Sequence, residues 1–409
     1  MKPITAVILG AGSRGEIYAS YALAHPDQLQ IVAVAEPKED RLRLLCDRHG
    51  VPAENRFSDW RELLARPKLA DAAFVCTLDD EHTAPALLAL EKGYHILLEK
   101  PMSNDEAECR AIEEAARTAG KTLAVCHVLR YTPFYQTIKG LIDGGEIGQV
   151  CAISQIENVA YWHQAHSFVR GNWRNSGETS FMLLQKSCHD MDILLWLVGR
   201  DCKKISSFGS LRHFTAENAP AGAPARCLEG CPHAESCLYY APKLYLTGNT
   251  GWPVDVLTTD LTPAGIEKAL REGPYGRCVY HCDNDVVDRQ VVNMEFEGGA
   301  VGSFVMTAFT ADGSRQLKVM GTRGHIQADM GTKEVWLCPF GGEKRLVPLK
   351  EMSGAGSGHG GGDFGLMEDF LSVLRTGEES LSSARASLQS HLMCFAAERS
   401  RLEGRVVEL

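Results

Sequence analysis

The chain has 409 residues, which allows two domains with large cores, and its 44% hydrophobic and 23% charged residues suit a soluble globular protein. A formal net charge of −10 without a basic stretch argues against nucleic acid as a partner. The apolar runs are too short to span a bilayer and the N-terminus lacks a signal-peptide layout, so we expect a cytoplasmic protein with no membrane partner, whose 14 cysteines are thiols or metal ligands.

The first predicted elements are a short apolar strand over 4–9, a glycine-rich turn and a helix over 16–24. The turn has the pattern G-x-G-x-x-G and is formed by Gly10, Ala11, Gly12, Ser13, Arg14 and Gly15. Its glycines allow a tight turn and the close approach of a pyrophosphate to the helix N-terminus. The pattern predicts dinucleotide binding. A tight glycine turn in some other α/β protein is the alternative.

A second predicted strand, over 31–35, ends at Glu36, 21 residues after Gly15. A carboxylate at this place binds the ribose hydroxyls of NAD and repels the 2′-phosphate of NADP. Lys38 and Arg41 lie nearby, and their positive charges favour the 2′-phosphate of NADP. On balance, we expect NAD as the cofactor.

Alternating strands and helices continue to residue 126, with strands over 72–76, 95–98 and 122–126 and helices over 82–92 and 105–119. Strands separated by helices predict a parallel, doubly wound sheet, which binds ligands at the carboxyl ends of its strands. Lys100 follows one such end, and His127 and Arg130 follow another.

The segment 162–174 is rich in aromatic and polar side chains. Aromatic faces pack on the C–H surfaces of sugars and polar groups bind their hydroxyls, so this segment is a candidate sugar-binding loop. A polar surface loop is the alternative. His163 and His166 as metal ligands are disfavoured, because no acid at a suitable spacing accompanies them.

A predicted amphipathic helix runs from Leu183 to Gly199 and carries an unusual polar cluster at its start. Lys186 and His189 are three residues apart and are therefore neighbours on the helix surface, with Asp190 beside them. The cluster is either a solvated helix face or a set of groups that handle protons. A lysine near a helix N-terminus opposes the macrodipole, which favours a functional reason.

An insert over about 215–285 contains a group of cysteines: Cys227, Cys231, Cys237, Cys278 and Cys282. Three closely spaced thiols and a distant fourth, Cys278 or Cys282, suit a closed tetrahedral zinc site, which would brace a segment poor in apolar runs. The spacing lacks the familiar C-x2-C pairs. An iron–sulfur site and plain thiols are the alternatives to zinc.

The remainder predicts a second domain dominated by strands, over 291–296, 300–308, 316–320, 325–328 and 334–339. Glycines 298 and 299 predict a hairpin turn, and the series of strands predicts a mainly antiparallel sheet. Two helices, over 366–375 and 382–401, end the chain. We predict two domains, 1–126 and 127–409. A glycine-rich segment over 353–363 contains His359 and reads either as a surface loop or as part of the site.

Several of these features together resemble the Gfo/Idh/MocA family of oxidoreductases, named for glucose–fructose oxidoreductase and inositol dehydrogenase. They are GAGSRG, Glu36, His82 before a helix, LLEKP ending at Pro101, Arg130-Tyr131-x-Pro133, and the His189-x-x-Asp192 helix that ends in WLVG. The resemblance covers most of the chain outside the insert. It implies a Rossmann domain, a second domain with a large open sheet, NAD(P)-dependent chemistry on sugars or cyclitols, and oligomers that pair through that sheet.

The resemblance also implies roles for single residues. The lysine of E-K-P and the helix histidine map onto Lys100 and His189, which with Lys186 are our candidate catalytic residues. Inositol dehydrogenases have an Asp where this chain has Gln185, and Lys186 and Asp190 are candidates to compensate. The predicted cofactor-binding residues are Gly10, Gly12, Ser13, Arg14, Gly15, Glu36, Thr77, His82, Glu99 and Lys100. The predicted substrate residues are His127, Arg130, Tyr131, His163, His166, Arg170, Trp173, Gln185, Asp190 and His359.

Three functions follow from this reading. The first is an NAD-dependent dehydrogenase acting on a secondary hydroxyl of a sugar, glycoside or cyclitol, in which a base takes the hydroxyl proton. The second is a redox-neutral glycosidase or lyase, which oxidises transiently, eliminates and returns the hydride, using Lys186, His189 and His359 for the extra proton transfers. The third, a non-catalytic NAD-binding regulator, leaves Lys100 and the helix cluster without a purpose.

Overall fold

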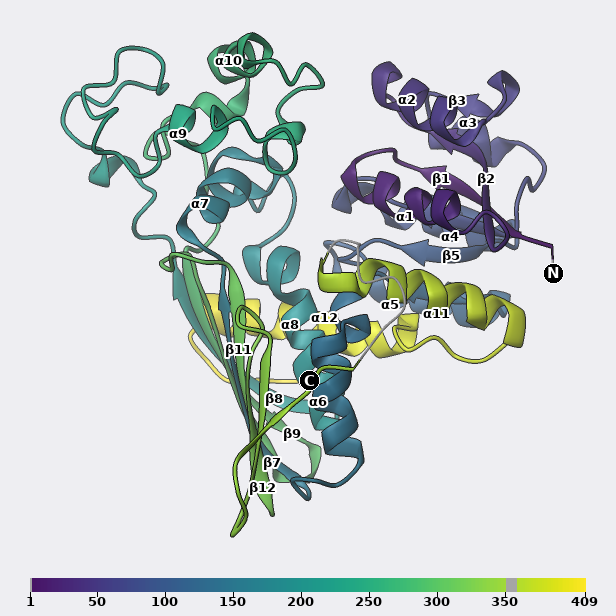
Figure 1. Ribbon diagram of the computed structural model, residues 1–409, viewed down its shortest axis with the longest axis vertical. Coiled ribbons are helices and arrows are strands. Elements are labelled where there is room, and N and C mark those ends of the chain that lie inside the picture. The colour runs from purple at the N-terminus through teal and green to yellow at the C-terminus, as the bar shows by residue number, and fades with distance from the viewer. Residues whose placement is uncertain (1, 351–358) are drawn as a thin grey trace.

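The computed structural model describes residues 2–350 and 359–409 and contains two sheets (Figure 1). The first sheet is parallel, with strand order β3-β2-β1-β4-β5-β6. Its strands are β1 (Ile4–Leu9), β2 (Leu29–Ala35), β3 (Arg56–Phe57), β4 (Ala72–Val75), β5 (His95–Leu98) and β6 (Leu123–Val125). The order reverses between β1 and β4, which is where such sheets bind dinucleotides.

Helices cover both faces of this sheet, as the doubly wound prediction requires. They are α1 (Ser13–Ala24), α2 (Glu39–His49), α3 (Trp60–Ala65), α4 (Thr83–Glu91) and α5 (Glu106–Ala119). The strands are buried on both faces, so they read as nearly continuous apolar runs such as that of β1. The predicted strands and helices are confirmed, with ends that shift by up to three residues.

The second sheet has nine strands in the order β14-β13-β12-β11-β7-β10-β9-β8-β15. They are β7 (Val150–Asn158), β8 (Cys202–Ser210), β9 (Arg289–Phe296), β10 (Val301–Thr307), β11 (Ser314–Gly321), β12 (Gly324–Asp329), β13 (Glu334–Pro339), β14 (Arg345–Val347) and β15 (Val407–Glu408). All neighbours are antiparallel except β7 and β10. The predicted turn between β9 and β10 is confirmed, with Gly298 and Gly299 at positive φ.

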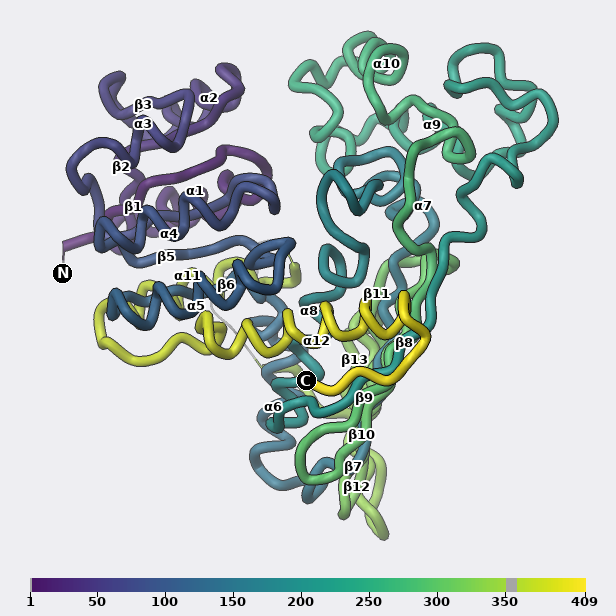
Figure 2. Tube along the Cα trace, turned by 180° about the vertical axis from the view of Figure 1, so that it is seen from behind, coloured from purple at the N-terminus to yellow at the C-terminus, as the bar shows by residue number. Residues whose placement is uncertain are grey.

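Helices lie on one face of the second sheet and leave the other face uncovered (Figures 1 and 2). The helices outside the first layer are α6 (Pro133–Asp143), α7 (Tyr161–His163), α8 (Met182–Val198), α9 (Ala241–Tyr245), α10 (Pro263–Glu272), α11 (Gly362–Thr376) and α12 (Ala384–Glu403). Helix α8 packs its apolar side chains into the core beneath the sheet and ends at Gly199, which adopts φ 67°.

The two C-terminal helices return to the first domain. Leu366 and Phe370 of α11 belong to the core cluster of the first sheet, and Leu388 of α12 joins the cluster on its other face. Figure 2 shows α12 passing between α5 and the second sheet. We keep the division into 1–126 and 127–409 as a proposal, with α11 and α12 fastening the two parts together.

The residues between β8 and β9, 211–288, form an excursion that we call the insert. It lies beyond α7, at one end of the second sheet (Figure 1). It has a small apolar core of its own, which includes Tyr245, Val254, Ile266 and Leu270. In the part of the chain that is described, no helix is long and apolar enough to cross a membrane.

Candidate active site

The turn between β1 and α1 has the shape that a dinucleotide pyrophosphate requires. Gly10 adopts φ +97°, and a Cβ there would lie 2.4 Å from the carbonyl oxygen of Cys76. A Cβ on Gly15 would lie 2.1 Å from the carbonyl oxygen of Gly10. Gly12 is the N-cap of α1, so the first backbone N–H groups of the helix, beginning at Ser13, face the turn. The residues present fit a bound dinucleotide.

Glu36 lies at the end of β2 and is tied to this turn. One carboxylate oxygen accepts a hydrogen bond from the N–H of Ala11 at 2.7 Å, and the other from the N–H of Lys38 at 3.0 Å. The side chain of Arg41 reaches Gly12, where a Cβ would be 3.9 Å from Nη1. An acid and an arginine therefore both stand where the adenosine ribose of a dinucleotide would bind.

Arg14 lies in an ion-pair network rather than at an open phosphate site. Its guanidinium contacts Glu99 at 2.7 Å and Asp363 at 2.6 Å, and it also donates to Tyr18. Burial alone would raise the pKa of Glu99, but Arg14 and Lys100 outweigh it and hold that pKa below its ordinary value. Arg14 and Glu99 thus join α1, the end of β5 and α11.

His82 and Thr77 position the loops after β4 and β5. Nδ1 of the buried His82 lies 2.7 Å from the carbonyl oxygen of Pro101, and Nε2 lies 3.2 Å from that of Thr77. His82 therefore ties the E-K-P turn to the neighbouring strand end. Lys100 follows β5, the strand next to β4, and therefore lies at the carboxyl end of the sheet, one strand from the switch point between β1 and β4.

Lys100 reaches across to the start of α8. Its Nζ donates to the carbonyl oxygen of Gln185 at 2.8 Å, while the Gln185 side chain lies near the hydroxyl of Ser180. The lysine from the first domain and the polar cluster on α8 therefore meet, as the sequence predicts. Gln185 contributes its backbone to Lys100 rather than a titratable group.

His189 is buried beside this lysine. Burial, and then the positive charge of Lys100, hold the pKa of His189 well below its ordinary value, so the imidazole is neutral near pH 7. Its ring centroid lies 5.7 Å from that of His127 and 6.2 Å from that of His359. Nδ1 of His189 has no hydrogen-bond partner among the described residues. A neutral imidazole is in the protonation state that a general base requires.

Lys186 belongs to a set of four charged side chains, which we call the charge quartet: the buried Glu157 and Asp190 and the partly buried Lys186 and Arg315. Nζ of Lys186 lies 3.3 Å from Glu157, and Arg315 lies 2.9 Å from Glu157 and 2.8 Å from Asp190. Burial lowers the pKa of Lys186, and Glu157 opposes that shift. Asp190 is fully buried and accepts a hydrogen bond from Arg315, so it holds that cation in place.

Glu157 and Arg315 are not among the residues that the sequence predicts for the site. A signal for Glu157 exists in β7, where Ile153, Gln155 and Glu157 occupy alternate positions and all three are buried. Polar side chains in phase with an inward-facing apolar residue indicate a buried polar network. Its partner Arg315 lies directly across the strand pair in β11, more than 150 positions along the chain.

Arg130 and Tyr131, two of the predicted substrate residues, have partners within the protein. Arg130 makes two hydrogen bonds to Asp192 of α8, at 2.6 and 2.7 Å, and the Tyr131 hydroxyl bonds Asp369 of α11 at 2.9 Å. Both side chains are buried. The neighbouring His127 is fully buried, and its ring stands between those of His189 and His391, 5.5 Å from the latter. His127 therefore contacts His189 and is not exposed to solvent.

The predicted sugar-binding segment folds into α7 and a π-helical stretch, Gln164–Arg170. His163 lies near the site, since Lys186 and Lys100 are among the cations that, with burial, hold its pKa well below the ordinary value. His166 turns into the insert, where it hydrogen-bonds Tyr245 at 2.9 Å and stacks on Tyr275 at 4.7 Å. Arg170 is wholly buried and donates hydrogen bonds to the carbonyl oxygens of Tyr239 and Arg277, so it fastens this segment to the insert.

His359 stands next to the site from the other side. Its Nδ1 lies 3.1 Å from Asp363, and the histidine and Arg14 together lower the pKa of Asp363 to about 2 against the effect of burial. Its side chain is 43% exposed. The first part of the glycine-rich segment, up to residue 358, lies outside the described residues.

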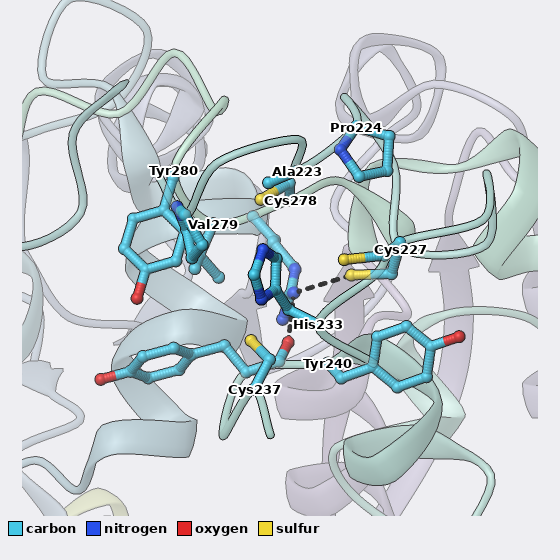
Figure 3. Close-up of a pocket in the computed structure, with 13 residues that line it drawn as sticks. Ala223, Pro224, Cys227, His233, Cys237, Tyr240, Cys278, Val279 and Tyr280 are labelled. Atoms are coloured by element: carbon cyan, nitrogen blue, oxygen red, sulfur yellow. Dashed lines mark hydrogen bonds between the residues drawn. The ribbon is translucent and has the colours of Figure 1, made fainter. Parts of the chain in front are cut away.

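Four of the five insert cysteines line a small cavity. The cavity, of about 20 Å³, is lined by Cys227, Cys231, Cys237, Cys278 and His233 (Figure 3). In residues 2–350 and 359–409, however, no three His, Cys, Asp or Glu side chains stand close enough to hold one ion. The thiol of Cys227 instead accepts from Arg170 and from the N–H of Ala241, and that of Cys282 donates to the carbonyl oxygen of Cys278. The zinc prediction is not supported.

Solved structures similar to this one confirm the architecture. Levoglucosan dehydrogenase in complex with NADH aligns with a TM-score of 0.74 and 20% identity, covering 100% of this chain and 99% of that one. The aldose–aldose oxidoreductase of Caulobacter crescentus aligns with a TM-score of 0.70 and 16% identity, covering all of both chains. At these identities the likeness shows the fold alone.

Sequence relatives extend the comparison. The putative oxidoreductase YteT of Bacillus subtilis is 25% identical over 325 residues, covering 75% of this chain and 73% of that protein. The inositol 2-dehydrogenase of Salmonella typhimurium is 23% identical over 206 residues, covering 50% of this chain and 57% of that protein.

Two family models match nearly the whole chain. One describes an oxidoreductase family with an NAD-binding Rossmann fold and matches residues 4–127, where the glycine turn, Glu36 and Lys100 lie. The other describes the C-terminal α/β domain of the same family and matches residues 139–409, where α8 and the open sheet lie. The chain belongs to the Gfo/Idh/MocA family of oxidoreductases.

Proposed function

We propose that this oxidoreductase is an NAD-dependent dehydrogenase acting on a secondary hydroxyl of a sugar, glycoside or cyclitol. The observation that carries the proposal is the meeting of Lys100 with the start of α8, at 2.8 Å, beside the neutral and buried His189. The names of relatives agree with this class of substrate, since one is an inositol dehydrogenase and another was solved with levoglucosan.

Different residues of the chain would bind the cofactor and transfer the proton. The turn at Gly10–Gly15 and Glu36 would hold NAD, which when bound accepts or returns a hydride at its nicotinamide. His189 would take the proton of the reacting hydroxyl, and Lys100 would donate a hydrogen bond to the same oxygen. The charge quartet would keep Lys186 in place as a second group able to hold or release a proton.

The experiment is a screen of sugars, glycosides and cyclitols with NAD, followed by NADH absorbance and by analysis of the carbohydrate products. We expect net NADH from at least one member of the panel. Product formation without net NADH would instead support the redox-neutral glycosidase, which the exposed, Asp363-paired His359 beside His189 favours. Tight NAD binding with no turnover on the whole panel would contradict both.

The cofactor preference is a separate prediction. Glu36 places a carboxylate at the end of β2, so NAD should bind more tightly than NADP, and Glu36→Ala should narrow the difference by removing the repulsion of the 2′-phosphate. Titrations of both cofactors against both proteins measure this. Equal or tighter NADP binding by the wild-type protein would show that Arg41, and not Glu36, decides the preference.

We also propose that the chain forms a homo-oligomer through the uncovered face of the second sheet. Phe208, Val291, Val305 and Ile156 are cross-strand neighbours in β8, β9, β10 and β7, and Phe208 is 68% exposed. Together they form a continuous cross-strand apolar row, and helices cover only one face of this sheet (Figure 1). A second copy of this chain would bury that row.

A further inference from the structure

Four aromatic rings form a continuous row from the insert toward Lys100. Trp252 contacts His163 with ring centroids 5.0 Å apart, His163 contacts Phe168 at 5.9 Å, and Phe168 contacts Trp173 at 6.3 Å. We call this set the aromatic row. Its members come from three separate segments: the insert, the α7 region and the short helix Asn172–Arg174.

The inner part of the row lies beside the candidate catalytic groups. Burial raises the pKa of Asp79, and His82, Lys100 and the side chain of Trp173 oppose that shift, so Trp173 and Lys100 both lie near this carboxyl. His163, in the middle of the row, is close enough to Lys186 and Lys100 for both charges to affect its titration. The row therefore begins where a reacting sugar ring would be held.

The outer end of the row is a half-exposed indole in a fixed orientation. Trp252 is 45% exposed, whereas Phe168 is only 3% exposed. Trp162 and His166 contact the Trp252 ring edge-on, at 5.4 and 5.5 Å, in addition to His163. Three such contacts hold the ring before anything binds, which lowers the entropic cost of using it as a binding surface.

The surroundings of this indole favour an apolar group over a charged one. The two titratable rings that touch Trp252 are His163 and His166. Burial holds the pKa of His163 well below its ordinary value and lowers that of His166 to about 3, so both rings are neutral near pH 7. A neutral aromatic surface gains most from a flat, apolar partner.

We propose that Trp252 binds the apolar aglycone of a glycoside whose sugar ring lies against Lys100 and His189. This inference rests on the proposed function for the position of the sugar, and it deepens that function by naming the substrate class. Trp252 lies one ring beyond His163, whose pKa is influenced by Lys186 and Lys100. A substrate that reaches Trp252 therefore extends beyond one sugar ring. The insert would then contribute Trp252 to the active site as a residue that determines specificity for the aglycone.

The test compares binding of phenyl and methyl hexopyranosides, matched in sugar and anomer, to the NADH-loaded protein by titration calorimetry. We expect the phenyl glycoside of the accepted sugar to bind about tenfold more tightly, the factor that corresponds to one aromatic contact of ~1.4 kcal/mol. Trp252→Ala should remove that advantage and leave methyl glycoside binding unchanged, and Trp252→Phe should restore most of it. Phe340→Ala, at an exposed aromatic on the far hairpin, is the matched control and should keep the full advantage.

The outcomes separate this inference from the proposed function. A phenyl advantage that survives in Trp252→Ala, or its absence in the wild-type protein, overturns the inference. Oxidation of free sugars or cyclitols with no phenyl preference also overturns it, while the dehydrogenase proposal stands. A Trp252-dependent phenyl preference without any hydride transfer supports the aglycone site and overturns the dehydrogenase proposal.

Discussion

His189 is the residue whose environment most resembles that of a general base. Changing it to alanine should lower turnover on the identified substrate by about 10²–10⁴-fold, the usual contribution of a positioned acid or base, with NAD affinity nearly unchanged. Lys186→Ala should act in the same direction, and the two losses should not multiply if the residues act as one unit. Steady-state kinetics and a cofactor titration measure these effects, with His325→Ala on β12 as the control histidine.

Near-normal turnover of both alanine variants would show that neither residue takes part in the reaction.

The sequence could identify His189 and Lys186 because both fall on one turn of a helix. It could not distinguish Arg130, which looks equally functional beside its motif but is neutralised by Asp192, 62 positions away. Burial and pairing decide such cases, and both depend on contacts that are distant in the chain.

At the scale of elements, α8, β7 and β11 are held together by the charge quartet. Glu157→Gln should lower the free energy of unfolding by about 3–5 kcal/mol, because it leaves the partly buried Lys186 and Arg315 with one carboxylate fewer. Urea unfolding measures the change. Glu343→Gln, at an exposed position, is the matched control and should stay within about 0.5 kcal/mol of wild type. A comparably small change in Glu157→Gln would mean that the quartet is already well solvated.

Elements with a regular hydrophobic period could be predicted from the sequence, and less regular ones could not. The parallel strands, the hairpin at Gly298 and Gly299, and α8 follow from local patterns. The π-helical stretch Gln164–Arg170 does not, because its packing depends on the insert, whose Tyr245 and Tyr275 receive His166. The role of the insert cysteines also depends on distant contacts that the sequence does not show. Arg170 and the backbone N–H of Ala241 donate hydrogen bonds to the thiol of Cys227.

At the scale of the whole molecule, buried histidines should make the fold sensitive to acid. Burial holds the pKa values of His127, His163 and His189 well below normal and lowers those of His166 and His391 to about 3. As pH falls below about 6.5, the unfolded chain binds protons that the folded chain does not, so stability present at neutral pH is lost. Each histidine lowers the free energy of unfolding by up to about 1.4 kcal/mol for each pH unit below that value.

Three buried carboxyl groups with raised pKa, in Asp79, Glu157 and Asp192, act in the opposite direction, but the histidines outnumber them. Thermal unfolding should therefore show a melting temperature that falls steadily between about pH 7 and about pH 5. A melting temperature that stays constant over this range would indicate that these histidines gain protons without unfolding the chain, through water that reaches the site.

We expect a net transfer of hydride from a sugar carbon to the nicotinamide beside Lys100, with release of the reduced cofactor. The most direct measurement uses fully deuterated sugars and glycosides, incubated with the protein and NAD, and determines the mass of the recovered cofactor. The account predicts NADH that carries one deuterium, formed by the wild-type protein and strongly reduced in Lys100→Met. Cofactor that stays free of deuterium over the whole panel, despite tight NAD binding, would contradict it.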